Sequence, residues 1–167
     1  MQHTSVKIAF LTGEYPPAPG GVGDYTQQLA RALRARVHGV DVLTIEGDAL
    51  VCYAGDGEDC RVLAQQRGLD WSPRCWPALL AALAALRPAW LHIQYQTGAY
   101  AMRPGVNLLP WRLRRQRERP RVAVTFHDLL EPYLFPKAGP VRRWANARLA
   151  RDADAVVATN SADAHKL

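Results

Sequence analysis

The chain has 167 residues, of which 49% are hydrophobic and 22% charged, which corresponds to one globular domain and excludes an intrinsically disordered chain. The longest uncharged apolar run, 76–86, is too short for a bilayer-spanning helix of about 20 residues, and residues 1–6 do not form a secretory signal, so we expect a cytoplasmic protein. Residues 1–100 contain 8 basic and 9 acidic side chains and residues 101–167 contain 13 and 6, a basic second half that predicts an anionic membrane, nucleic acid or phosphorylated substrate as partner.

The start of the chain predicts a strand, a helix and a second strand. The apolar run 6–12 ends at Gly13 and is typical of a buried strand. A loop with three prolines follows, and apolar residues then recur at helical spacing from Val22 to about Arg36. A second strand is predicted at 40–45. Strand, helix and strand within so short a stretch indicate parallel strands with a right-handed crossover.

The later elements continue this alternation. The predicted strands are 50–54, 90–95, 121–126 and 155–159, and the predicted helices are a short piece near 61–67, then 78–86, a basic helix over 108–119, and 141–151. Residues 160–167 are typical of a helix start. The pattern predicts an α/β fold, a Rossmann-like, doubly wound parallel sheet of at least five strands in a three-layer α/β/α arrangement. Because the sequence stops inside a predicted helix, we expect a single domain, 1–167, cut from a longer chain.

The glycine cluster after the first strand is a candidate anion site. Gly20, Gly21, Val22 and Gly23 open a helix, where backbone N–H groups and the helix dipole favour negative charge. The dinucleotide fingerprint Gly-x-Gly-x-x-Gly is not present, because position 26 is threonine. This spacing fits a loop that contacts a phosphate or a sugar. It fits equally a tight connection that binds no ligand. Acidic residues beside the loop would suit sugar hydroxyls better than a phosphate.

His127 and Asp128 follow the strand 121–126, at the edge where open parallel sheets bind ligands. A histidine there can hydrogen-bond hydroxyls or transfer protons, and the alternative is a half-buried histidine bonded to a loop carbonyl. Gln96, with Tyr95 and Tyr100, offers groups suited to sugars, unless the aromatics only cover the sheet edge. The three cysteines, at 52, 60 and 75, predict neither a zinc site nor a disulfide framework, and the sequence has no metal-binding histidine cluster.

An arginine-rich stretch is the candidate membrane contact. Arg112, Arg114, Arg115 and Arg117 accompany a tryptophan and three leucines, a composition that fits an amphipathic helix on an anionic lipid surface. The alternative is a solvated helix face. Nucleic acid is not expected, because no recognised binding module accompanies the charge.

The order of these segments resembles a known family. A strand ending in Thr-Gly-Glu-Tyr-Pro-Pro, the glycine loop 19–25 and the helix segment 29–33 resemble the N-terminal domain of family 4 ("group 1") retaining glycosyltransferases of the GT-B fold. Later stretches at 92–96, 124–129 and 153–161 also resemble it. The resemblance implies a transferase of the hexosyltransferase type, which moves a sugar from a nucleotide-sugar to a lipid-linked, polysaccharide or small-molecule acceptor. It implies that this reaction needs no metal and no cofactor.

The resemblance also implies roles for individual residues. His127 matches the histidine at the transferred sugar, Gly20, Gly21 and Val22 match the loop near the donor diphosphate and acceptor, and Asp24, Gln96 and Asp128 are implied acceptor contacts. The family's C-terminal nucleotide-sugar domain is not in this sequence, so we expect residues 1–167 alone to be inactive. The rival readings are a stand-alone Rossmann-like binding module and a nicotinamide-dependent reductase, which the incomplete glycine fingerprint disfavours.

Overall fold

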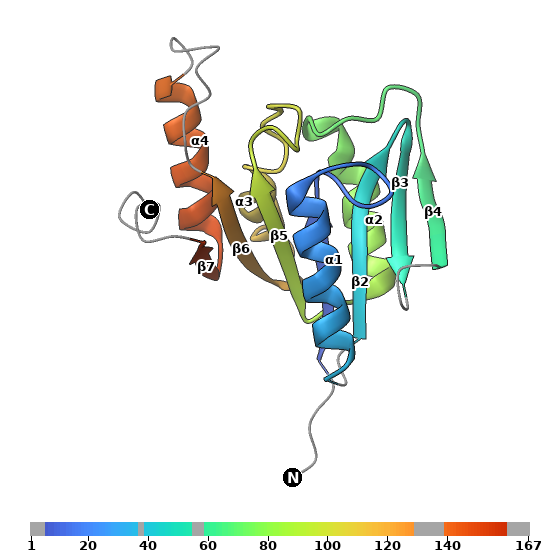
Figure 1. Ribbon diagram of the computed structural model, residues 1–167. Helices are drawn as coiled ribbons and strands as arrows, with labels where there is room; N and C mark the ends of the chain where they lie inside the picture. The colour runs from blue at the N-terminus through green and yellow to red at the C-terminus, as the bar shows by residue number, and fades with distance from the viewer. Residues whose placement is uncertain (1–5, 37–38, 55–58, 129–138, 160–167) are drawn as a thin grey trace.

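The computed structural model describes residues 6–36, 39–54, 59–128 and 139–159 (Figure 1). The strands and helices in chain order are β1 (Lys7–Thr12), α1 (Gly21–Arg34), β2 (Gly39–Glu46), β3 (Ala49–Ala54), β4 (Asp59–Gln65), the 3-10 turn η1 (Pro73–Cys75), α2 (Trp76–Leu86), β5 (Trp90–Gln96), α3 (Leu109–Leu113), β6 (Arg121–Asp128), α4 (Gly139–Asp152) and β7 (Ala155–Ala158).

The strands form one seven-stranded sheet in the order β4-β3-β2-β1-β5-β6-β7. The five strands β2, β1, β5, β6 and β7 are parallel. β3 and β4 extend the sheet as antiparallel strands beside β2. The predicted parallel sheet of at least five strands is therefore confirmed, with an antiparallel hairpin added at one side.

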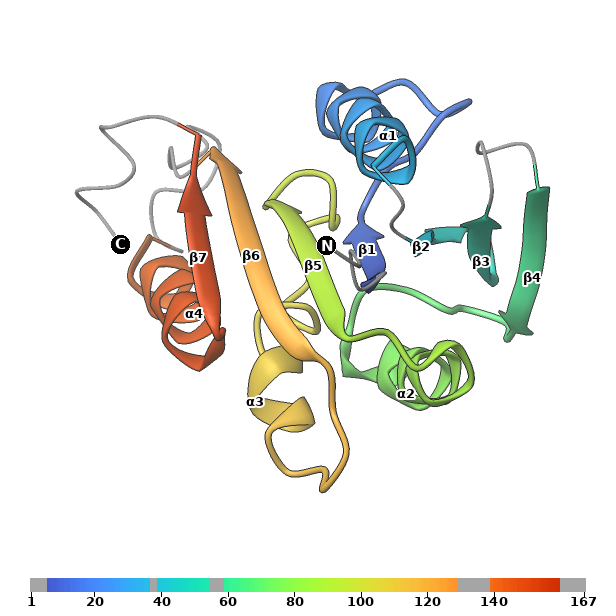
Figure 2. The ribbon, with the colours of Figure 1, turned by 90° about the horizontal axis from the view of Figure 1, so that it is seen from below.

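Helices cover both faces of the sheet, so the predicted three-layer arrangement is confirmed. Figure 2 shows α1 on one face and α2, α3 and α4 on the other. Successive side chains of β1 point to opposite faces of the sheet. Phe10 belongs to the apolar cluster on the face covered by α1, whereas Ala9 and Leu11 belong to the larger cluster on the other face. Each face thus has its own apolar cluster, and burial on both sides accounts for the nearly continuous apolar strands.

Two predicted elements are corrected. The predicted helical piece at 61–67 is wrong, because β4 occupies this segment and pairs antiparallel with β3. The predicted helix 108–119 is present only as the five residues of α3. Beyond Leu113 the sequence offers arginines and no further apolar face to bury, so the helix has nothing to pack and ends. The predicted helix start at 160–167 lies outside the described residues.

Candidate functional site

The topology marks one edge of the sheet as a ligand site. Among the parallel strands, β1 lies between β2 and β5, so the chain winds from β1 in opposite directions. Open α/β sheets bind ligands at such a switch point, outside the carboxyl ends of the strands. Here that place lies between the loop after β1 and the segment after β5, and both β5 and β6 end at this edge (Figure 1).

The loop after β1 turns back so that Glu14 caps helix α1. The Oε1 atom of Glu14 accepts hydrogen bonds from the backbone N–H groups of Val22, at 3.0 Å, and Gly23, at 3.4 Å. The Thr12 hydroxyl donates to the Glu14 carbonyl oxygen at 2.7 Å and fixes the turn. A carboxylate of the chain itself therefore occupies the positive end of the helix dipole.

Gly20 is required by this close approach. A Cβ atom at Gly20 would lie well under 3.0 Å from the Glu14 carboxyl group, whereas a Cβ at Gly21 would meet no atom within 4 Å. Gly23 is also restricted, since its Cβ would lie 3.0 Å from the Glu14 carbonyl oxygen. The glycine cluster thus serves first to bring Glu14 onto the helix, and only Gly21 faces open space.

His127 lies at an irregularity in β6. Tyr95 of β5 is opposite Phe126 and Gln96 is opposite Asp128, so His127 is an extra residue between two paired positions. Such a bulge redirects a side chain and is common beside active sites. The His127 ring packs edge-on against Tyr25 of α1, with ring centroids 4.9 Å apart. His127 and the glycine loop therefore lie on the same side of the molecule.

A polar ladder connects β5 and β6 beneath this site. The Nε2 atom of His127 lies 2.8 Å from Oε1 of Gln94, and Nε2 of His92 lies 2.8 Å from the Thr125 hydroxyl. Burial and the neighbouring His127 lower the pKa of His92 to about 4. Burial also lowers the pKa of His127, while the Glu14 carboxylate opposes this shift. Both imidazoles are therefore uncharged near neutral pH.

The two tyrosines at the end of β5 and in the segment after it stabilise the fold and do not face the site. Tyr100 is 1% exposed, and its hydroxyl lies 2.9 Å from the Leu11 carbonyl oxygen and 3.2 Å from that of Gln94. The Tyr95 hydroxyl is buried and accepts a hydrogen bond from Asn107 at 2.8 Å. The interpretation of these two tyrosines as sugar contacts is corrected, because they hold the segment after β5 against the ends of β1 and β5.

The other predicted site residues are placed as follows. Gly20, Gly21 and Val22 lie at the start of α1, although the Val22 side chain is buried and its N–H is bonded to Glu14. Asp24 is exposed in the first turn of α1, and Gln96 is half-exposed at the end of β5. The backbone of Asp128 ends β6 opposite Gln96, while its side chain is not among those described.

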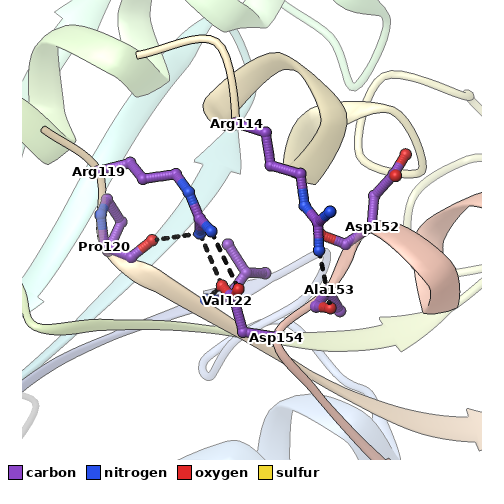
Figure 3. Close-up of polar contacts among 7 residues, drawn as sticks. All are labelled: Arg114, Arg119, Pro120, Val122, Asp152, Ala153 and Asp154. Atoms are coloured by element: carbon purple, nitrogen blue, oxygen red, sulfur yellow. Dashed lines mark hydrogen bonds and ion pairs between the residues drawn. The ribbon is translucent and has the colours of Figure 1, made fainter. Parts of the chain in front are cut away.

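The arginine stretch lies on the face of the sheet opposite α1 (Figure 2). Arg114 donates to the carbonyl oxygens of Asp152, at 2.9 Å, and Ala153, at 3.4 Å, at the end of α4 (Figure 3). Arg115 stacks over Trp111 at 3.7 Å from the ring centroid. Arg112 is half-exposed and Arg117 is exposed. These arginines are therefore apart from His127, and Arg114 has a structural contact.

Near Arg114 lies a salt bridge that the sequence analysis did not predict. Arg119 forms two hydrogen bonds with the Asp154 carboxylate, which also accepts from the backbone N–H of Val122 (Figure 3). These contacts lower the pKa of Asp154 to about 2. A surface hollow of about 280 Å³ beside Pro88 and Pro120 lies here, at the amino ends of β5 and β6. It is at the edge of the sheet away from His127.

Three residues of the site were not singled out by sequence. Gln94 and Tyr25 contact His127, and Glu14, considered only as a negative charge near the loop, caps α1. A signal existed for Gln94, since an amide between two apolar residues, Ile93 and Tyr95, in a predicted buried strand indicates a polar contact in the interior. All three cysteines are free. Within the described ranges, no helix has the length and apolar character needed to cross a bilayer, and no group of three potential metal ligands occurs.

Comparison with known proteins decides the family. Residues 20–167 match the family model of the glycosyl transferase 4-like domain. The chain belongs to this family. The glycosyl transferase 4-like domain described here also resembles a solved structure, the sucrose-phosphate synthase (tll1590) from Thermosynechococcus elongatus, with a TM-score of 0.71 and 19% sequence identity over 96% of this chain. The match covers 44% of the synthase chain, so the domain spans less than half of that protein. No curated protein matches in sequence. The predicted family and the Rossmann-like fold of an N-terminal GT-B half are confirmed.

Proposed function

We propose that this domain forms the acceptor side of a retaining glycosyltransferase, which transfers a hexose from a nucleotide-sugar to an acceptor hydroxyl. The observation that carries the proposal is the 4.9 Å contact between the rings of Tyr25 and His127, because it joins the helix of the glycine loop to the histidine at the sheet edge. In this proposal, a nucleotide-sugar domain supplied by the rest of a longer chain would form the other side of the active-site cleft. Residues 1–167 alone would not catalyse sugar transfer.

The described residues suit neutral sugar hydroxyls. The Glu14 carboxylate already accepts hydrogen bonds from the N–H groups of Val22 and Gly23. A phosphate at this end of the helix would therefore be repelled by a negative charge that occupies its position. His127 is uncharged, half-buried and flanked by an aromatic ring, a combination that can bond a hydroxyl and pack against a sugar ring. In this proposal, Gly21, Asp24 and Gln96 border the acceptor, and the protein mainly orients reactants and stabilises charge on the leaving diphosphate.

Ligand titrations followed by NMR of the backbone amides test the proposal. Simple hexosides, sugar phosphates and nucleotide-sugars are added separately to the 167-residue chain. We expect shifts confined to 13–25, 94–97 and 127, which His127→Ala abolishes. His92→Gln is the matched control, since His92 is on the same face of the sheet but bonds Thr125. Binding that leaves these segments unperturbed, or no binding of any sugar, would overturn the proposal.

A further inference from the structure

Gln94 is the fully buried partner of His127. It is 0% exposed in the middle of β5, and its Oε1 atom lies 2.8 Å from Nε2 of His127. Its other amide atom, Nε2, is buried and has no hydrogen-bond partner among the residues that the structure describes. An amide that leaves one end unpaired in a protein interior costs about 1–3 kcal/mol. A residue kept at such a cost indicates a role beyond packing.

The hydrogen bond between these residues sets the chemistry of the imidazole. In this orientation the amide presents its oxygen to the ring, and because an amide oxygen only accepts, Nε2 of His127 carries the proton that lies between them. A neutral imidazole has one N–H, and its Nδ1 atom then presents a lone pair. No described residue bonds to Nδ1. The ring is held by Gln94 on one side, by Tyr25 on another and by the bulge in β6.

We propose that Gln94 is a positioning residue, which holds His127 as the Nε2-protonated form so that Nδ1 accepts a hydrogen bond from a hydroxyl of the bound sugar. The identity of the ligand rests on the proposed function, whereas the relation between Gln94 and His127 does not. In this arrangement the histidine recognises a hydroxyl, and it cannot offer a cationic N–H to a phosphate.

The neutral amide matters because of the groups around the ring. Among the side chains that the structure describes, the charged or titratable groups that face His127 are Glu14 from the loop after β1, Tyr25 from α1 and His92 from β5. A carboxylate in place of the Gln94 amide would favour the imidazolium, which donates from both nitrogens. Glutamine therefore fixes the ring in the same place while leaving it uncharged.

The test is NMR of histidine labelled with ¹⁵N in the 167-residue chain, which reports the tautomer and the pKa of each imidazole. In the unsubstituted chain we expect the Nε2–H form of His127. Gln94→Glu should raise the pKa of His127 by at least about one unit. Gln96→Glu is the matched control, since it adds the same charge two residues along β5 without the hydrogen bond, and it should raise the pKa of His127 much less.

Gln94→Met separates positioning from charge. It has a similar length without hydrogen-bonding groups, so His127 should become a mixture of both tautomers, while unchanged signals of His92 confirm that the sheet is folded. An Nδ1–H form in the unsubstituted chain, or equal pKa shifts in Gln94→Glu and Gln96→Glu, would overturn the inference. So would an unchanged tautomer in a folded Gln94→Met variant.

The two proposals fail separately. If the tautomer results hold but no sugar binds, only the proposed function is lost. If sugars bind at His127 but the tautomer is Nδ1–H, only the role of Gln94 is lost. When both hold, Gln94→Met should weaken sugar binding roughly five- to tenfold, as expected for the loss of about one neutral hydrogen bond, and Gln94→Glu should weaken it as well.

Discussion

The carboxylate of Glu14 lies 3.0 Å from the backbone nitrogen of Val22, so a side chain of the domain occupies the anion-binding end of α1. A bare glycine loop before a helix would leave these N–H groups to a ligand phosphate. In this domain they are already satisfied, and the loop offers a preformed carboxylate beside His127. This relationship separates the stabilising role of the glycine loop from the binding role proposed for it.

Removing the Glu14 carboxylate should change both roles. Glu14→Ala should lower the free energy of unfolding by about 1 kcal/mol, as for loss of a helix cap, and strengthen binding of inorganic phosphate because the helix N–H groups become free. Urea denaturation and phosphate titration measure the two effects. Asp24→Ala is the control, since it removes a charge from the same turn. If Glu14→Ala and Asp24→Ala changed stability and phosphate binding equally, Glu14 would not be a specific cap of α1.

Gly20 and Gly21 should respond oppositely to alanine. The added Cβ at Gly20 would collide with the Glu14 carboxyl group, whereas the one at Gly21 meets open space. Gly20→Ala should therefore lower the free energy of unfolding by about 1 kcal/mol or more, because Glu14 must leave the helix. Gly21→Ala should be neutral or stabilising by about 0.5–1 kcal/mol. Urea denaturation tests both, and equal destabilisation would show that Glu14 is not held as described.

Arg114 should contribute to stability, and Arg117 should not. Arg114 donates to carbonyl oxygens at the end of α4 (Figure 3), while Arg117 is exposed. Arg114→Ala should lower the free energy of unfolding by about 1 kcal/mol, and Arg117→Ala should change it by less than about 0.5 kcal/mol. Binding of anionic vesicles is therefore better tested with Arg112 and Arg117. Equal thermal midpoints for the two variants would argue against the Arg114 contact.

The buried His92 should make the domain less stable in mild acid. Its folded pKa of about 4 lies below the ordinary histidine value of 6.5, so the unfolded chain binds more protons between these two pH values. Stability from this group is present above about pH 6.5 and is lost as the pH falls toward 4, up to about 3 kcal/mol. His92→Gln should flatten the dependence of urea midpoints on pH in this range. An unchanged dependence of the urea midpoint on pH would contradict the burial of a neutral His92. The lowered pKa of His127 contributes a smaller dependence in the same direction.

Sequence predicted the parallel core well because its elements carry their own patterns. β1, β5 and β6 are apolar runs bounded by turn residues, and α1 has clear helical spacing. β4 was missed, and a helical piece was predicted near 61–67. Nearly all side chains of β4 are exposed, so no alternation of buried and exposed residues marks it as a strand. Its conformation comes from pairing with β3, a tertiary interaction that local propensity does not contain.

The site was predicted in outline and not in its contacts. The glycine loop and His127 were expected at one edge, and the structure brings them together through Tyr25. The hydrogen bonds of Glu14 and Gln94 depend on how β1, β5 and β6 align, including a bulge one residue long. Such a shift leaves no trace in residue spacing, and it decides which of Gln94 and Gln96 reaches the imidazole.

The outer margin of β4 has a consequence for behaviour at high concentration. β4 ends the sheet, so within the described part of the chain no strand lies beside its outward backbone groups, and Val62 there is 61% exposed. Such a margin can recruit a strand from another molecule. The irregular pairing opposite Leu50 and Val51 and the charge of Arg61 work against this recruitment. Replacing Arg61 with a β-branched apolar residue should favour such recruitment and the growth of fibres, while leaving the edge of the sheet that carries His127 unchanged.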